Sequence, residues 1–403
     1  MPGPIEFQHG ALSDLRVLEL GTLLAGPFCG QLLGDMGAEV IKIEPPNQGD
    51  PMRAWGRQKH GDPSLWWPVI ARNKKSITLD LRQRAGQEVL RELAATADFL
   101  LENFRPGTLE KWGLGYPELS AVNPRLIMIR VSGYGQWGPY AHRASFGAIG
   151  EAMGGLRYVV GDPSSPPSRM GISIGDSLAA TFACLGALSA LHYRERTGRG
   201  QVVDSAIYEA VLGMMESLIT EYDKTGFVRE RTGAILPKVA PSNVYPTRDG
   251  LVLIAANQDT VFKRLCETMG RPELATHPDY ANHQARGLRQ SELDALIGRW
   301  SSLLPTEEVL GLMDRNGVPA GLIYRAPDML EDPQFVARDA IVKVSHPQFG
   351  ELRMQNVAPK LSETPGGIRS PSPALGQHNE EVYQRLMRFT PERVETLRRQ
   401  GVI

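Results

Sequence analysis

The sequence predicts an α/β protein with a doubly wound large domain and a smaller α+β domain. Three observations predict it. A chain of 403 residues is too long for one ordinary hydrophobic core, so two domains are expected. Apolar stretches of strand length alternate with helical patterns through the first half of the chain, which is typical of parallel sheets. Near residue 225 this alternation gives way to a hairpin and several helical patterns.

The N-terminal elements predict a βαβ unit. Residues 16–20 (RVLEL) and 39–43 (EVIKI) have the apolar composition of buried strands. Between them Pro27 can open a helix that ends before Gly37, because the first helical turn has no use for the missing N–H of proline. The alternation continues with strands expected at 76–81, 99–102 and 125–131 and a helix at 85–97. Such an order predicts a parallel sheet with helices on both faces.

The remaining elements set the expected domain boundaries. A long apolar helix is predicted from about Asp176 to Glu195. Asp249-Gly250 between two apolar runs indicates a hairpin, and helices are expected at 260–269, 291–303 and 306–316. A second hairpin around Phe349-Gly350 precedes a polar C-terminal helix. We therefore expect a large domain over 1–225, a small α+β domain over 226–330, and a segment over 331–403 that returns to the large domain.

Composition excludes several classes of function. The formal net charge is −1, so no general basic field attracts nucleic acid or an anionic membrane. Three widely spaced cysteines favour a reducing compartment over a disulfide framework, and no cysteine–histidine cluster suggests a metal site. The segment MPGPIEFQHGALSDL lacks the pattern of a signal peptide, so a cytoplasmic protein is expected. The apolar run 177–191 is short for a membrane span and suits a buried helix.

The βαβ start raises the possibility of dinucleotide binding. Glu44 follows the second strand at about the spacing of the acid that binds a ribose in such proteins. The fingerprint also needs close-set glycines, so that backbone N–H groups can approach a pyrophosphate. Here the turn is GTLLAG, with Leu23 and Leu24 where small residues are needed. The sequence therefore disfavours NAD binding.

Several stretches together resemble the class III coenzyme A transferases, the family that includes formyl-CoA transferase and the carnitine CoA-transferases. They occur in the family's order over nearly the whole chain: LAGPF, GAEVIKIEPP, NKKSITLDL, ENFRPGTLEKWGLGY, SGYGQWGPY, GISIGDS, TGRGQVVD, NGVPAG and LGQHNEEV. The resemblance implies a Rossmann-like large domain, a small domain and two chains interlocked as a homodimer. It also implies that CoA is a substrate and that no cofactor is tightly bound.

The family's nucleophile is the aspartate that ends the stretch matched here by GISIGD, which is Asp176. The resemblance implies that its carboxylate attacks an acyl-CoA thioester and forms a mixed anhydride. The released thiolate then converts the anhydride into an aspartyl-CoA thioester, as in other covalent catalysis. The simpler alternative is a helix N-cap, because Asp176 lies next to the start of an apolar helix, where aspartate is favoured. The family pattern favours the nucleophile.

The resemblance also implies a CoA site. The family's CoA contacts fall here on Leu79, Arg82, Asn103, Phe104 and Lys111. For each cation the alternative is a solvated surface charge, and Phe104 could simply belong to the core.

Three further arginines are candidate anion ligands. Arg53, in the stretch GDPMRAW, could contact a phosphate of CoA. Arg143 and Arg169 lie in loops beside the proposed site and could bind the acceptor's distal carboxylate. That carboxylate needs a cation, because burying an unpaired charge is costly. Each of the three could equally be a surface residue.

Departures from the formyl-CoA transferase pattern bear on specificity. The family's His-Val-Gln stretch after the first strand is Thr22-Leu23-Leu24 here, and an arginine after the second strand is Pro45. A run of glycines that covers that enzyme's active site is not visible in the sequence. Formate or oxalate specificity is therefore not expected. The C-terminal pattern looks more like the branch that passes CoA from succinyl-CoA to small dicarboxylic acids.

Two alternatives remain. The related α-methylacyl-CoA racemases use a His-Asp pair after the glycine-rich loop, but Ser145 and Phe146 occupy that place here. A non-catalytic CoA-binding protein would not need an aspartate at 176. A CoA-transferase is the function that the sequence favours.

Overall fold

The computed structural model describes residues 10–56 and 64–403, which form two compact units. The first comprises the described residues up to Leu156 together with Met170–Thr220 and Val336–Ile403. The second comprises Arg157–Arg169 and Glu221–Phe335. Residues 1–9, in which the sequence shows no signal-peptide pattern, lie outside the described residues.

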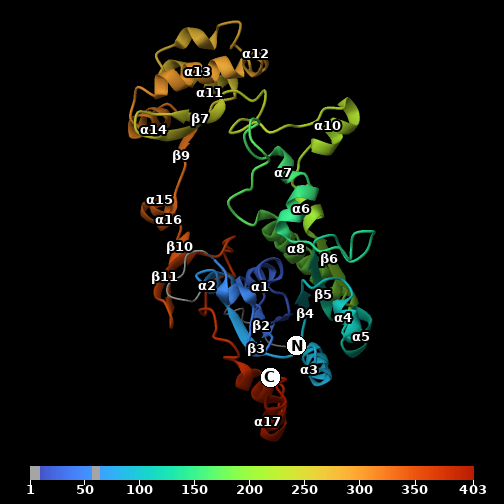
Figure 1. The fold of residues 1–403 in the computed structure, drawn as a ribbon. Coiled ribbons are helices and arrows are strands. Elements are labelled where there is room, and N and C mark those ends of the chain that lie inside the picture. Colours follow the sequence, from blue (N-terminus) through green and yellow to red (C-terminus); the bar gives the residue numbers. More distant parts are fainter. Residues whose placement is uncertain (1–9, 57–63) are drawn as a thin grey trace. The chain divides into compact units, whose positions relative to one another are not determined.

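The first unit is built on a six-stranded sheet with the order β3-β2-β1-β4-β5-β6 (Figure 1). All of its pairs are parallel. The strands are β1 (Arg16–Glu19), β2 (Glu39–Glu44), β3 (Lys74–Thr78), β4 (Phe99–Glu102), β5 (Ile127–Ser132) and β6 (Val202–Ala206). This confirms the predicted α/β class, and the order is that of doubly wound nucleotide-binding sheets.

Strand β3 begins earlier than predicted. The apolar pattern indicated 76–81, whereas the strand runs over Lys74–Thr78. Lys74 is buried in the sheet because its Nζ pairs with Glu19 Oε2 at 2.7 Å and donates to the Pro27 carbonyl at 2.7 Å. Hydrophobic patterning does not assign a charged residue to a buried strand. Here the lysine can be buried because its ion pair compensates for the loss of water.

Helices cover both faces of this sheet. On one face α1 (Ala25–Asp35) and α8 (Ile174–Thr197) pack on Val17, Phe99 and Ile129. Close packing follows from a line of buried alanines on α8: Ala179, Ala183, Ala187 and Ala190. The other face carries α3 (Arg84–Ala94), α5 (Tyr116–Val122), the π-helical η3 (Glu381–Leu386) and α17 (Pro391–Arg399).

The remaining elements of the first unit are short, and two of its helices run on into the second. They are η1 (Pro51–Ala54), α2 (Trp67–Ile70), α4 (Thr108–Lys111), α6 (Gly147–Met153), α7 (Leu156–Val159), α9 (Ile207–Leu212), α10 (Leu218–Thr225) and the hairpin β10 (Ile341–His346) and β11 (Gly350–Gln355). The hairpin predicted around Phe349-Gly350 is thereby confirmed.

The second unit is an antiparallel sheet of three strands with helices. The hairpin predicted at Asp249-Gly250 joins β7 (Ser242–Pro246) to β8 (Leu251–Ala255), and β9 (Ala320–Leu322) pairs with β8. The three predicted helices are confirmed as α11 (Asp259–Thr268), α13 (Gln290–Ser301) and α14 (Thr306–Arg315). Also present are η2 (Pro272–Ala275), α12 (His283–Leu288), α15 (Ala326–Glu331) and α16 (Pro333–Ala337).

The strand order singles out one place on the first unit. The chain leaves β1 toward one side of the sheet and leaves β4 toward the other, so a crevice opens at their carboxyl ends. Ligands of such sheets bind there. Helix α8 leads into the parallel strand β6 and therefore runs against the strands, which places its first turn at the same carboxyl edge.

Candidate active site

Asp176 is the third residue of α8 and is half-buried. The helix begins at Ile174 with Ser173 in the N-cap position, so the N-cap alternative for Asp176 is wrong. The reason lies in a neighbouring element. Glu151 Oε1 accepts the Gly175 N–H at 3.2 Å and so binds one of the amides that have no partner within the helix. Asp176 is therefore not needed as the cap.

Gly147, the first residue of α6, lies directly against Asp176. A β-carbon at Gly147 would stand 2.2 Å from Asp176 Oδ2 and 3.0 Å from Oδ1. Only glycine lets the carboxylate occupy this place. The carboxylate thus lies at the starts of two helices, where backbone amides carry partial positive charge.

Sequence reasoning missed Gly147 and Glu151. Glu151 is 1% exposed and reaches α8 from α6. A signal was present in the glycines of α6 and its C-cap. A β-carbon on Gly150 would stand 2.3 Å from Ile207, and a β-carbon on Gly154 would stand 2.6 Å from Val211. These glycines let α6 pack closely against α9, which holds Gly147 and Glu151 at the first turn of α8.

The loop after β1 is held by the side chains of Asn103 and Asp50. Asn103 Oδ1 accepts the Thr22 N–H at 2.8 Å, and its Nδ2 donates to the Thr22 carbonyl at 2.9 Å. Asp50 Oδ1 accepts the Leu23 N–H at 3.0 Å. The backbone φ of Leu23 is 63°, a value that is strained for leucine. Asn103, predicted as a CoA contact, therefore orders the backbone beside the crevice.

A buried ion network supports this loop. Lys42 Nζ donates to the Gly21 carbonyl at 2.5 Å and pairs with Asp50 at 2.8 Å and Glu19 at 3.1 Å. Burial alone would lower the pKa of Lys42, but the carboxylates of Glu19 and Asp50 raise it above its ordinary value. The lysine therefore stays charged and keeps its hold on the loop.

A cavity of about 200 Å³ lies at the carboxyl ends of β1, β2, β3 and β4. It is lined by Leu20, Thr22, Ile43, Pro45, Gln48, Leu79, Asp80, Leu81, Arg82, Phe104 and Trp112. Three predicted CoA contacts, Leu79, Arg82 and Phe104, thus come together. Whole ligand pockets usually exceed about 300 Å³, so this one suits one end of a larger molecule.

The two predicted cations near the cavity differ in their contacts. The Arg82 side chain is 71% exposed, and its Nε donates to Asp80 Oδ1 at 2.8 Å. Lys111 is the exposed last residue of α4 and immediately precedes Trp112 of the cavity. The Trp112 ring meets Phe104 edge-on, with centroids 5.8 Å apart. The cavity therefore has an aromatic wall and one cation, Arg82, among the residues that line it.

Arg53 does not line this cavity. Its Nε and Nη2 each donate to Glu44 at 2.8 Å, its Nη1 donates to the Pro373 carbonyl at 3.1 Å, and its guanidinium stacks on Trp67 at 3.8 Å. It borders a separate depression of about 370 Å³ beside His346. The contacts present are those of a structural arginine.

The two predicted substrate arginines lie in different units. Arg143 is exposed in the loop before α6, with its guanidinium 3.7 Å from the Tyr140 ring centroid. Arg169 is exposed and belongs to the second unit. Arg143 lies shortly before Gly147 along the chain, so its loop leads directly to the start of α6.

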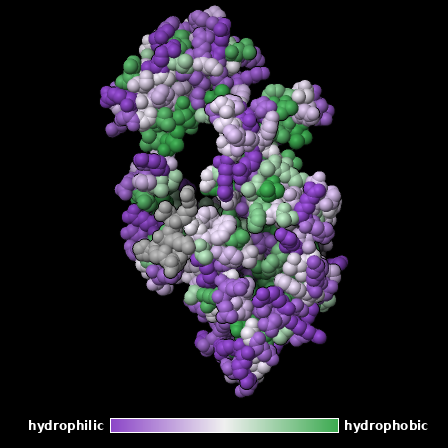
Figure 2. Space-filling model, viewed as in Figure 1, coloured by the Kyte–Doolittle hydropathy of each residue, from purple (hydrophilic) through white to green (hydrophobic). Residues whose placement is uncertain are grey.

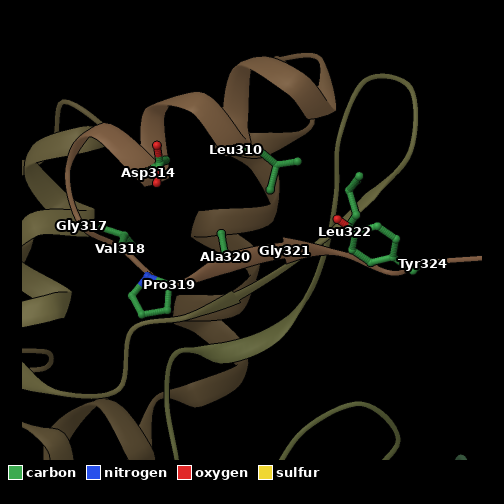
Figure 3. Close-up of a pocket in the computed structure, with 9 residues that line it drawn as sticks. All are labelled: Leu310, Asp314, Gly317, Val318, Pro319, Ala320, Gly321, Leu322 and Tyr324. Carbon is green, nitrogen blue, oxygen red and sulfur yellow. The ribbon is translucent and has the colours of Figure 1, made fainter. Parts of the chain in front are cut away.

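Two further cavities are present, and the first is lined in part by Tyr140, the ring beside Arg143. One of about 390 Å³ lies in the first unit and is bordered by aromatic rings such as Tyr134 and Trp137 with Asp204. The NGVPAG stretch borders another of about 640 Å³ in the second unit, formed by the end of α14 and by β9 (Figure 3). Its lining is mostly apolar with one carboxylate, Asp314. Within residues 10–56 and 64–403, no group of three or more His, Cys, Asp or Glu could hold a metal ion.

Comparisons with known proteins identify the family of the chain. The sequence model described as CoA-transferase family III matches residues 12–379. Succinyl-CoA--D-citramalate CoA-transferase of Chloroflexus aurantiacus is 61% identical over 393 residues, which are 97% of this chain and 98% of that protein. The β subunit of succinyl-CoA--L-malate CoA-transferase from the same organism is 42% identical over 97% of this chain and 98% of its own length.

A solved structure gives the same result. The crystal structure of a CaiB/BaiF family protein from Brucella suis superposes with a TM-score of 0.83 at 35% identity, over 94% of this chain and 100% of that one. The family match and the full-length relatives confirm the resemblance that the motifs indicated. The chain belongs to CoA-transferase family III and is a class III CoA-transferase.

Proposed function

We propose that this enzyme transfers CoA from succinyl-CoA to a small dicarboxylic acid of the citramalate type, with Asp176 as the nucleophile. The observation that carries the proposal is the position of Asp176. Its carboxylate lies against Gly147 at the carboxyl edge of the sheet, the edge that also holds the cavity with Leu79, Arg82 and Phe104. The donor and acceptor follow from the 61% identical relative, whose name states both.

The chemistry needs a carboxylate that attacks and later leaves. Asp176 adds to the thioester carbonyl of succinyl-CoA, and the CoA thiolate departs, which gives a mixed anhydride. The thiolate then attacks the aspartyl carbonyl and displaces succinate, which gives an aspartyl-CoA thioester. The acceptor carboxylate displaces the thiolate to form a second anhydride. Attack of the thiolate on the acceptor's carbonyl releases the new acyl-CoA and restores Asp176.

The geometry supports these steps at two points. The partial positive charge at the starts of α6 and α8 favours the oxyanion of each tetrahedral intermediate. The small cavity with its Phe104–Trp112 wall fits the adenine end of CoA, Arg82 in its lining supplies charge for phosphates, and Lys111 on α4 is a further candidate.

Arg143 is our candidate for the acceptor's distal carboxylate. It is exposed, it lies on the loop that leads to Gly147, and its guanidinium lies over the Tyr140 ring. A guanidinium that binds a carboxylate also discriminates, because a monocarboxylate leaves it unpaired. Arg169, in the loop that precedes GISIGD along the chain, is the second candidate.

We also propose that the protein acts as a homodimer. Helix α8 is long and apolar enough to cross a membrane, yet only 33% of its most apolar window is buried. Its outward face carries Phe182, Leu185 and Leu188, which are 38%, 59% and 39% exposed. Figure 2 shows apolar side chains at the surface over α6 and α8. A second copy of the chain, as the resemblance implies, would cover this face and remove it from water.

The proposal is tested with purified protein and succinyl-CoA against matched concentrations of acids. The dicarboxylates are citramalate, malate and glutarate, and the monocarboxylates are acetate, butyrate and formate. Mass spectrometry of the acyl-CoA products should show that the dicarboxylates are the faster acceptors. Equal or faster turnover of the monocarboxylates would contradict the proposed acceptor, and no new acyl-CoA from any acid would contradict transfer itself.

A further inference from the structure

A buried carboxylate ends strand β4 just before the loop of the CoA cavity. Glu102 is 0% exposed. Its Oε2 accepts the Phe104 N–H at 2.6 Å, and its Oε1 accepts the Arg130 Nε–H at 2.7 Å. Glu102 thus holds the backbone of one residue of the aromatic wall and is itself held by a cation on the neighbouring strand β5.

The other edge of the Arg130 guanidinium reaches helix α4. Nη1 donates to Glu110 Oε1 at 2.6 Å, and Nη2 donates to Oε2 at 3.2 Å. Glu110 is two residues before Trp112, the second ring of the aromatic wall. One buried arginine, 7% exposed, therefore joins the backbone under Phe104 to the helix that carries Trp112.

None of the three charged residues touches the cavity. Glu102, Arg130 and Glu110 are absent from the residues that line it, whereas Phe104 and Trp112 both line it. The other charge near the guanidinium is Asp204 on β6, the register partner of Arg130. Contact between the three and a ligand in the cavity is therefore indirect, through the two rings, whose centroids are 5.8 Å apart.

We propose that Arg130, clamped between Glu102 and Glu110, is a positioning residue that sets the spacing of the Phe104–Trp112 wall for CoA. The inference rests on the proposed function, in which this cavity takes one end of CoA. Bidentate geometry on Glu110 suits such a role, because a planar guanidinium constrains direction as well as distance. A purely structural ion pair would affect stability and leave CoA affinity unchanged.

The test replaces the half-exposed member of the clamp. Glu110→Gln removes one carboxylate and leaves Arg130 paired with Glu102, so the fold should persist. Glu92→Gln is a matched control, because Glu92 accepts a bidentate Arg393 at 2.6 and 3.0 Å and its side chain is 42% exposed, against 43% for Glu110. Calorimetric titration with CoA gives affinity, turnover with succinyl-CoA gives kcat and KM, and thermal unfolding gives stability.

Glu110→Gln should weaken CoA binding and raise KM for succinyl-CoA by roughly three- to tenfold, the range for residues that act through a network, while kcat stays within about twofold. Glu92→Gln should change neither, and Glu110→Asp should restore part of the affinity. If Glu110→Gln and Glu92→Gln bind CoA equally well, the positioning role is overturned. A wild-type protein that binds CoA but transfers none would contradict the proposed function alone.

Discussion

The Asp176 carboxylate occupies the space that a β-carbon on Gly147 would take. That β-carbon would stand 2.2 Å from Oδ2, closer than any real contact. The two residues belong to different helices, so the packing of α6 against α8 and α9 determines where the carboxylate lies. The Asp176 carboxylate therefore lies against the backbone of α6, and this close packing suits a group that must meet a thioester carbonyl in one orientation.

Gly147→Ala should displace this carboxylate and reduce transfer. The added methyl must move Asp176 or α6 by about an ångström, and a misplacement of that size can cost roughly 100-fold in rate. Binding of CoA should change little, since the cavity proposed for CoA lies elsewhere on the sheet edge. The measurement is kcat with succinyl-CoA beside the CoA affinity.

Gly367→Ala is the control, because a β-carbon there meets nothing within 4 Å. Wild-type kcat in Gly147→Ala would show that the position of the carboxylate is not critical.

Arg82→Ala should weaken CoA binding only by roughly fivefold, because the side chain is largely exposed and solvent screens its charge. Asp80→Asn should have the opposite effect. It removes a negative charge that now holds Arg82 and repels phosphate. Titration with CoA at low and high salt measures both, and the differences should shrink as salt rises. Arg84→Ala is the control for a nearby exposed arginine, paired with Glu88. An Arg82 variant no weaker than this control would assign Arg82 to the solvated surface.

The exposed apolar face of α8 predicts association. Light scattering at micromolar protein should give about twice the mass of one chain. Leu185→Glu places a charge on a residue that is 59% exposed in the single chain, so it should shift the mass toward that of one chain. Leu303→Glu, at another exposed leucine (73%), should leave the mass unchanged. A wild-type mass equal to one chain would rule out the dimer.

Glu102 predicts a pH dependence of stability. Burial raises the pKa of Glu102 to about 7, against the opposing effects of Arg130 and the Phe104 N–H. Because this value lies above the ordinary 4.5, the contribution of Glu102 to stability is complete below pH 4.5 and is lost as pH rises through 7. Between those limits the free energy of unfolding should fall relative to Glu102→Gln, by at most about 1.4 kcal/mol per pH unit.

Urea unfolding of both proteins at pH 5, 6, 7 and 8 gives this difference. The change to glutamine shifts the free energy of unfolding by the same amount at every pH, so the test is the slope of the difference between the two proteins with pH. A difference that is flat with pH would mean that Glu102 keeps an ordinary pKa.

Hydrophobic patterning predicted the sheet and the helices of the second unit, because strands such as β1, β4 and β5 are buried on both faces and α11, α13 and α14 have one apolar face. It could not predict the ionic interior. Lys42 and Lys74 are 1% and 2% exposed, and each is compensated by carboxylates from other strands. Such pairing depends on strand order and register, and neither can be read directly from the sequence.

The candidate site shows the same division. Motifs named Asp176, Arg82 and Phe104, whose places follow from local sequence. They did not reveal Gly147, Glu151 or the clamp on Arg130, because those contacts join residues 20 to 30 apart along the chain through tertiary packing. Arg53 shows the converse. Its sequence context suits a phosphate ligand, but Glu44 takes two of its donors.

The central claim is that Asp176 carries CoA, and trapping the intermediate tests it most directly. Protein treated with succinyl-CoA and no acceptor would be digested and examined by mass spectrometry, before and after borohydride reduction. The peptide that contains Asp176 should carry CoA as a thioester, and reduction should convert that aspartate to homoserine. Asp176→Ala should bind CoA, form no adduct and lose transfer by several orders of magnitude. An adduct on another residue, or an Asp176→Ala protein within about tenfold of wild-type activity, would contradict the account.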